Sequence, residues 1–263
     1  MTGPAPPRSI EGSIEGSTDG AIGPGVRAAV AWAVDLVGDG ARVGLGTGRA
    51  AAAFIDSLGG RVRQGLTVGV VPTSRASAQQ ARALGIPFVD LDDDVPLDIT
   101  VDGADEVAPN LDLLKGKGGA LVKERIVAAA SREQVIVVGS DKLVSVLGTR
   151  GPVPVEVIPL GRGHVARGLQ ALGLRSTLRL DGGVGGRPFV TENHNLILDV
   201  TLAAGLADGR AARALERAIR ALAGVVDTGL FLGTAGRVAV GHDDGRLTIL
   251  SAPPPDAESG NAR

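Results

Sequence analysis

Residues 97–124 read LDITVDGADEVAPNLDLLKGKGGALVKE. Residues 97–101 form a short, mostly apolar run, which predicts a buried strand. Asp102 and Asp105 come directly after this run, at the carboxyl end of the predicted strand. Open α/β sheets bind their ligands at the carboxyl ends of the strands. This stretch therefore predicts an α/β fold with a ligand site beside the two aspartates.

A glycine-rich loop and a glutamate complete the same stretch. Lys115 precedes the loop of residues 116–119, whose backbone amides can approach a small anion closely because most of its residues lack a Cβ atom. Glu124 shares a predicted helical face with small or apolar residues, namely Ala120, Leu121, Val127, Ala128 and Ser131. A carboxylate on such a face loses hydration, which raises its pKa and suits it to proton transfer at carbon. The alternative is an ordinary ion pair with Lys123, Arg125 or a neighbouring helix.

Helix and strand patterns alternate through the first part of the chain. Helical spacing covers residues 26–37, 50–58 and 77–84, and short apolar runs that predict strands cover residues 42–45, 66–71, 88–91, 97–101 and 134–138. This alternation predicts a parallel, Rossmann-like sheet.

The rhythm changes after residue 152. Strands are expected at 153–158, 175–180, 190–200 and 225–231, and helices at 162–172 and 210–222. This order is the split βαββαβ pattern of a small ferredoxin-like α+β domain. Residues 237–241 and 247–250 then predict two strands of the large domain. The expected division is therefore a catalytic Rossmann-like domain (26–152 and 231–250), an inserted small domain (153–230), and disordered tails at 1–25 and 251–263.

A second glycine motif lies at residues 43–49, VGLGTGR, between a predicted strand and a predicted helix. Its place superficially suggests a dinucleotide site. However, Arg49 stands where the third glycine of that fingerprint belongs, and the next strand ends in residues 72–75, PTSR, without an acidic residue for a ribose hydroxyl. The amides of residues 46–49 at a helix N-terminus are better suited to a phosphate or a sugar hydroxyl.

Composition excludes several function classes. The net charge of -2 gives no reason to expect nucleic acid or an anionic membrane as a partner. No apolar run reaches 18 residues, so a membrane span is not expected. The absence of cysteine excludes disulfides and thiolate chemistry, and the three histidines lack metal-ligand spacing. We therefore expect a cytoplasmic protein without a metal.

Five separated motifs occur in the order found in ribose-5-phosphate isomerases of the A type. They are VDGADE (101–106), KGxGGALxxE (115–124), VPVEVIP (153–159), TENHNLILDV (191–200) and GVVDTGLF (224–231). The chain resembles that family from about residue 27 to about residue 250. The resemblance implies a two-lobed fold and interconversion of D-ribose 5-phosphate and D-ribulose 5-phosphate through an enediolate, in the non-oxidative branch of the pentose phosphate pathway. It also implies a homodimer or homotetramer and no cofactor.

The resemblance assigns roles residue by residue. Glu124 matches the general base of the family, Lys115 stabilises the enediolate, and Asp102 and Asp105 assist ring opening and hydroxyl proton transfer. The implied substrate-binding residues are Thr47, Gly48, Arg49, Ala50, Gly103, Ala104, Gly116, Lys117, Gly118 and Lys142. Without the resemblance, the two aspartates would be interpreted as a turn or helix cap, and Lys142 as a surface lysine.

Some positions depart from the family pattern. Arg49 and Ala50 replace the usual Ser-Thr pair, Arg27 replaces a common lysine, and Lys117 interrupts a run of glycines. Two other classes stay open at this point. Similar large-lobe folds serve as sugar-phosphate-sensing domains of repressors, and distantly similar acyl-CoA transferases use a glutamate as a covalent nucleophile. No DNA-binding module and no CoA-binding features are visible in the sequence.

Overall fold

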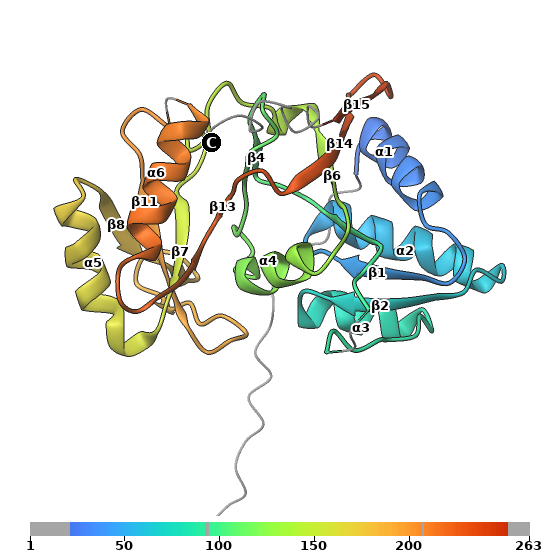
Figure 1. The fold of residues 1–263 in the computed structure, drawn as a ribbon, viewed down its shortest axis with the longest axis horizontal. Helices are drawn as coiled ribbons and strands as arrows, with labels where there is room; N and C mark the ends of the chain where they lie inside the picture. The colour runs from blue at the N-terminus through green and yellow to red at the C-terminus, as the bar shows by residue number, and fades with distance from the viewer. Residues whose placement is uncertain (1–21, 93–94, 207, 252–263) are drawn as a thin grey trace, which may run out of the picture.

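The computed structural model describes residues 22–92, 95–206 and 208–251 (Figure 1). The first described helix, α1, spans Pro24–Asp35 and thus begins two residues before the predicted start of the folded region. Pro24 suits the first helical turn, where its missing N–H has no intrahelical acceptor. Most of the two predicted tails lies outside the described residues. In the part of the chain that the structure describes, no helix is both long and apolar enough to cross a bilayer.

A six-stranded sheet forms the centre of the large lobe. Its order is β15-β14-β6-β3-β1-β2, and all neighbours are parallel except the pair β14 and β15. The strands are β1 (Ala41–Leu45), β2 (Val68–Pro72), β3 (Ile99–Asp102), β6 (Gln134–Gly139), β14 (Ala235–Gly241) and β15 (Leu247–Ser251). The predicted Rossmann-like parallel sheet is confirmed.

Both faces of this sheet are covered. The helices are α1, α2 (Arg49–Arg63), α3 (Arg75–Ala83) and α4 (Leu121–Ala129). Along β6, Val135 and Val137 join a core cluster with α1 and α2, whereas Ile136 and Val138 join a second cluster with Leu121 of α4. Alternate residues of a strand point to opposite faces, so a strand buried on both sides is apolar throughout.

The small lobe is built on a four-stranded antiparallel sheet of order β12-β7-β11-β8. Its elements, within residues 153–206 and 208–228, are β7 (Val153–Val157), α5 (Arg162–Ala171), β8 (Arg175–Leu178), β11 (Leu196–Thr201), α6 (Gly209–Arg220) and β12 (Val225–Thr228). The predicted βαββαβ order is confirmed. Helices α5 and α6 lie beside each other on this lobe, at the side of the molecule away from α1 (Figure 1). A short hairpin of β9 (Leu180–Asp181) and β10 (Arg187–Pro188) lies between β8 and β11.

Four predicted strands were wrong in extent. The run 175–180 ends as β8 at Leu178, and Leu180 belongs to β9 of the hairpin. Residues 88–91 make a single bridge, Phe88 to Val70, because the Asp90 side chain accepts the Asp92 amide and turns the chain away. The run 190–200 becomes a strand only at Leu196, since residues 191–195 form a turn. The run 225–231 divides between two sheets, and its second part is β13 (Leu230–Phe231).

A third sheet, which was not predicted, connects the two lobes. It has the antiparallel order β13-β5-β4, with β4 at Glu106–Val107 and β5 at Leu113–Leu114. Two-residue strands show no usable periodicity, so sequence patterns could not reveal them. Two short 3₁₀ helices, η1 (Ser140–Lys142) and η2 (Pro159–Gly161), follow β6 and β7.

Gly229 lies at the crossing between the small lobe and the third sheet. Its carbonyl accepts the amide of Lys115 at 2.9 Å, and its own amide donates to the carbonyl of Pro154 at 2.8 Å. A Cβ atom on Gly229 would lie 2.2 Å from the Lys115 carbonyl oxygen and 2.6 Å from the Pro154 ring. Only glycine therefore fits where the chain passes behind Lys115.

We expect Gly229→Ala to lower the free energy of unfolding by about 1 to 3 kcal/mol, because the added methyl group meets backbone atoms that cannot move away cheaply. Urea unfolding followed by circular dichroism measures this difference. Gly38→Ala is the control, since a Cβ atom there has nothing within 4 Å. Equal stability of the two variants would contradict the packing argument.

Candidate active site

The buried ammonium group of Lys115 lies at the centre of the site. Its Nζ atom is 2.9 Å from Oδ2 of Asp102, 3.3 Å from Oε2 of Glu124, and donates to the carbonyl of Gly103 at 2.6 Å. The carbonyl contact is a hydrogen bond, and the two carboxylate contacts are ion pairs. All three charged side chains are buried. A single cation thus faces two carboxylates away from solvent.

Three different elements bring these charges together. Asp102 is the last residue of β3, and Lys115 directly follows β5 of the third sheet. Glu124 lies in the first turn of α4 on its buried side, as the helical spacing predicted. The carboxyl end of β3 is therefore the meeting point of the large lobe and the third sheet.

The environment of Glu124 suits a base. Burial raises the pKa of Glu124 to about 7, and although Lys115 opposes this rise, the negative charge of Asp102 adds to it. A carboxylate with a pKa near neutrality can both accept and return a proton at physiological pH. For Lys115, burial alone would lower the pKa, but the attraction of Asp102 and Glu124 outweighs burial and the pKa is raised. Lys115 therefore stays an ammonium group.

Asp102 also holds the glycine motif that follows β1. Its Oδ1 atom accepts the amides of Thr47 at 3.1 Å and Gly103 at 2.7 Å. A Cβ atom on Gly46 would lie 2.1 Å from the same oxygen, so the backbone can approach Asp102 only as glycine. Gly48 has a positive φ of 104° and caps α2, which begins at Arg49. The motif therefore lies against the charged cluster at the start of a helix.

The loop of residues 116–119 lies beside Asp105 and beside the glycine motif that follows β1. Oδ2 of Asp105 accepts the amide of Lys117 at 3.0 Å. A Cβ atom on Gly118 would lie 3.9 Å from Cγ2 of Thr47, so this loop and the glycine motif after β1 are neighbours. The exposed residues Lys117 and Gly118 form the solvent side of the loop. The loop and the glycine motif after β1 thus lie together on the side of Asp105.

Comparison with known proteins identifies the family. The family model described as ribose 5-phosphate isomerase A (phosphoriboisomerase A) matches residues 69–245. Ribose-5-phosphate isomerase A of Rhodopseudomonas palustris (strain TIE-1) is 44% identical over 232 residues, which is 86% of this chain and 97% of that protein. The chain belongs to the ribose 5-phosphate isomerase A family. It is therefore an aldose–ketose isomerase, and this favours an enzyme over a sugar-phosphate sensor or an acyl-CoA transferase.

Solved structures of ribose 5-phosphate isomerases agree with this assignment. The enzyme of Methanocaldococcus jannaschii is 40% identical and superimposes with a TM-score of 0.79 over 87% of this chain and 98% of that chain. A D-ribose-5-phosphate isomerase in complex with phospho-erythronic acid is 33% identical, with a TM-score of 0.79 over 86% of this chain and 97% of that chain.

The resemblance implies more site residues than those that lie beside the charged cluster of Asp102, Lys115 and Glu124. Asp102, Asp105, Lys115 and Glu124 come together with five of the others: Thr47, Gly103, Gly116, Lys117 and Gly118. Gly48, Arg49 and Ala50 form the start of α2, and Ala104 lies next to Gly103. Lys142 lies in η1 after β6, the strand next to β3, so it occupies the same edge of the sheet. Its Nζ atom is 3.4 Å from Oδ2 of Asp141.

Lys123 and Arg125, the alternative ion-pair partners of Glu124, contact other carboxylates. Lys123 donates to Glu192 at 2.8 Å. Arg125 pairs with Asp227, and its Cζ atom lies 4.2 Å from the centroid of the Phe231 ring. The ordinary ion pair of Glu124 with either neighbour on its helix was therefore the wrong interpretation.

Sequence reasoning missed residues that hold the site from a distance. Thr73, which follows β2, shares a 2.8 Å hydrogen bond between its hydroxyl and that of Thr47. Glu192 also accepts the amide of Arg75 at the start of α3. Glu192 belongs to the TENHN motif, which was noticed as a family motif without a role. Nothing in the residues around Thr73 indicated its contact.

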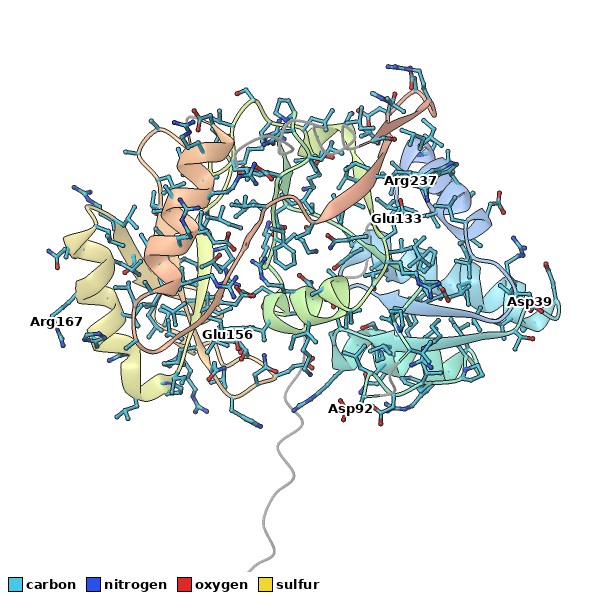
Figure 2. The ribbon with its side chains drawn as sticks, viewed as in Figure 1. Asp39, Asp92, Glu133, Glu156, Arg167 and Arg237 are labelled. Carbon is cyan, nitrogen blue, oxygen red and sulfur yellow. The ribbon has the colours of Figure 1, made fainter. Side chains whose placement is uncertain are left out.

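The buried Glu156 of β7 fixes the TENHN turn. Its Oε1 atom accepts from the side chains of Thr191 at 3.0 Å, Asn193 at 3.1 Å and Asn195 at 2.9 Å. Glu156 lies in the small lobe, far from Glu133 and Arg237 of the large sheet (Figure 2).

Among the described residues, no group of three or more His, Asp or Glu side chains is arranged to hold a metal ion.

The raised pKa of Glu124 predicts a cost in stability that depends on pH. The folded protein holds this proton up to about pH 7, whereas an unfolded glutamate releases it near pH 4.5. The stability that protonated Glu124 contributes is thus complete below pH 4.5 and lost as pH rises to about 7. The wild type should therefore lose unfolding free energy between pH 4.5 and about pH 7, whereas Glu124→Gln should not. The advantage of Glu124→Gln should grow by about 1 to 3 kcal/mol over this range and stay constant at higher pH.

Urea unfolding at pH 5, 6, 7 and 8 measures this gain. Glu133→Gln is the control, because Glu133 pairs with Arg237 at 2.6 Å in a part-buried site away from Lys115. A stability difference between wild type and Glu124→Gln that does not change with pH would contradict a raised pKa.

Proposed function

We propose that Glu124 is the general base by which this chain interconverts D-ribose 5-phosphate and D-ribulose 5-phosphate. In the open-chain aldose, Glu124 removes the proton from carbon 2, and the electron pair moves toward the carbonyl oxygen on carbon 1. The hydroxyl proton on the oxygen of carbon 2 moves to the oxygen of carbon 1, and the enediolate takes the carbon-bound proton back from Glu124 at carbon 1, which leaves a carbonyl at carbon 2 and gives the ketose. The observation that carries this proposal is the burial of Glu124 beside the Lys115 ammonium group, with a pKa of about 7.

The other groups stabilise the enediolate. Lys115 supplies a fixed positive charge, and the amide of Gly118 in the loop 116–119 supplies an N–H donor that need not reorient as negative charge develops. Asp102 keeps Lys115 charged and in place through the 2.9 Å contact. Asp105 lies beside the same loop and is placed to accept and return hydroxyl protons during ring opening.

The substrate class is supported by a relative. Phospho-erythronic acid, found in the complex with a related isomerase, is a phosphorylated sugar acid with hydroxyl groups and an anionic end. Such a molecule resembles an enediolate that carries a phosphate. We propose that the amides at the start of α2 hold the phosphate, together with Arg49, because a helix N-terminus favours an anion. We further propose action in the cytoplasm, as expected from the absence of cysteine, and assembly as a homodimer or homotetramer, as expected from the resemblance.

Replacing the base tests the mechanism. Glu124→Gln keeps the size of the side chain and removes its ability to accept a proton, so kcat should fall roughly a hundredfold or more. Binding of phospho-erythronic acid should change little. Turnover is measured by the formation of ribulose 5-phosphate from ribose 5-phosphate, and binding by calorimetry.

Glu133→Gln is again the matched control and should keep wild-type turnover, because Glu133 precedes β6 at the amino end of the strand, opposite the site. A Glu124→Gln variant with a tenth of the wild-type kcat would rule out Glu124 as the base. Binding without any turnover in the wild type would instead support a sensor.

Arg49 is the position where this chain differs most from the usual family loop. Arg49 is exposed at the first residue of α2. A bidentate contact with the phosphate would contribute about 1.5 to 3 kcal/mol, so Arg49→Ala should raise KM for ribose 5-phosphate roughly tenfold or more, with a smaller effect on kcat. Arg63→Ala, at the exposed far end of the same helix, is the control. Unchanged kinetics for Arg49→Ala would mean that Arg27, Lys142 or backbone amides hold the phosphate.

A further inference from the structure

We infer that Arg179 of the small lobe is a positioning residue for the isomerase reaction, because its guanidinium group fixes the direction in which the amides of the loop 116–119 point. This inference rests on the proposed role of the Gly118 amide of this loop in stabilising the enediolate. Arg179 does not contact Glu124 or Lys115 in the described structure, so it acts through the loop.

The guanidinium group of Arg179 is held from one side and holds the loop on the other. Its Nε and Nη2 atoms form a two-point contact with the carboxylate of Asp199 on β11, at 2.9 and 2.5 Å. Its Nη1 atom donates to the carbonyls of Gly116 at 2.9 Å and Lys117 at 3.0 Å. The side chains of Arg179 and Asp199 are both part-buried. The planar guanidinium makes both sets of contacts at once, which a lysine ammonium group cannot do.

Arg179 shares the Gly116 carbonyl with the amide of Gly119, which donates to it at 3.0 Å, and it also donates to the Lys117 carbonyl; these contacts set where the following amides point. In a trans peptide unit the C=O and N–H bonds point in opposite directions, and the described residues contain no cis peptide bond. The carbonyls of Gly116 and Lys117 point to Arg179, so the amides of Lys117 and Gly118 point away from it. The hydrogen bond from the Lys117 amide to Asp105 at 3.0 Å agrees with this direction. The amide of Gly118 is turned toward the same side, where Thr47 lies.

A second contact from the same segment holds the end of the loop. The amide of Phe189 donates to the carbonyl of Arg179 at 2.9 Å, and the Arg179 Cζ atom lies 5.9 Å from the centroid of the Phe189 ring. The Phe189 ring covers Gly119, where a Cβ atom would lie 2.5 Å from it. Gly116 and Gly119 both have positive φ angles, 99° and 78°. The loop is therefore fixed at both ends by the small lobe.

The direction of these amides matters because glycine peptides rotate easily. If a peptide unit turned over, a carbonyl oxygen would replace an N–H donor and repel the negative charge of the enediolate. That charge develops during the reaction and is absent from the bound sugar, so the effect should appear in kcat more than in KM. Arg179 thus contributes by keeping donors aimed at the site before the reaction begins.

Kinetics of Arg179→Met and Arg179→Lys test this inference. We expect kcat to fall roughly tenfold to a hundredfold in Arg179→Met, with KM for ribose 5-phosphate changed less than about threefold. Arg179→Lys should restore only part of kcat, because one ammonium group cannot bridge Asp199 and both carbonyls. Arg175→Met, at an exposed arginine at the start of β8, the strand that ends one residue before Arg179, should keep wild-type kinetics.

Amide hydrogen exchange distinguishes positioning from a merely structural role. In Arg179→Met and Arg179→Lys, the amide hydrogens of residues 116–119 should exchange faster than in the wild type. Peptides of α5 and α6 should keep their protection. Unchanged kcat in Arg179→Lys and Arg179→Met would overturn the inference. Lowered kcat with wild-type exchange in the loop would overturn it as well. If Arg179→Met does not fold, Arg179→Lys and Asp199→Asn decide, and both should show the same loss in smaller degree.

The two proposals fail in different ways. If Glu124→Gln is inactive while both Arg179 variants behave as wild type, only the positioning role is wrong. If Glu124→Gln keeps turnover, the proposed mechanism is wrong whatever the Arg179 variants do.

Discussion

The buried contact of one ammonium group with two carboxylates is the constraint on which the site depends. A buried charge is costly unless it is paired, and Lys115 can pair fully with only one of its two neighbours. Asp102 has the shorter contact and two backbone amides on its other oxygen. The remaining imbalance falls on Glu124, whose burial raises its pKa to about 7. The charge imbalance that makes Glu124 costly to bury therefore also suits it to transfer a proton.

The scaffold exists to bring that cation and those carboxylates together from separate elements. Parallel strands place Asp102 at one sheet edge, and a helix places Glu124 above it. Lys115 needs a further element, and the small third sheet supplies it: β13 crosses behind Lys115, where Gly229 leaves room for the two backbones to meet. The third sheet is also where the chain leaves the small lobe, so the position of Lys115 depends on both lobes.

The small lobe holds the active site from outside and contributes no residue to the charged cluster. Glu156 fixes the TENHN turn, and that turn carries Glu192 to Lys123 and to the start of α3. Arg179 holds the carbonyl side of the loop 116–119. These contacts act on the loop and the helix next to Glu124, so the small lobe bears on the charged cluster through elements of the large lobe.

The sequence by itself determined the two sheet types, the order of their elements, and the clustering of Asp102, Asp105, Lys115 and Glu124 near one strand end. It could do so because periodicity shows which face of an element is buried, and because these four residues lie within one short stretch. Only the tertiary structure decided which partners meet that buried face. Arg179 and Glu192 reach the site from residues more than sixty positions away, and the strands of the third sheet are two residues long. Such contacts depend on how the lobes pack, which local patterns of burial do not record.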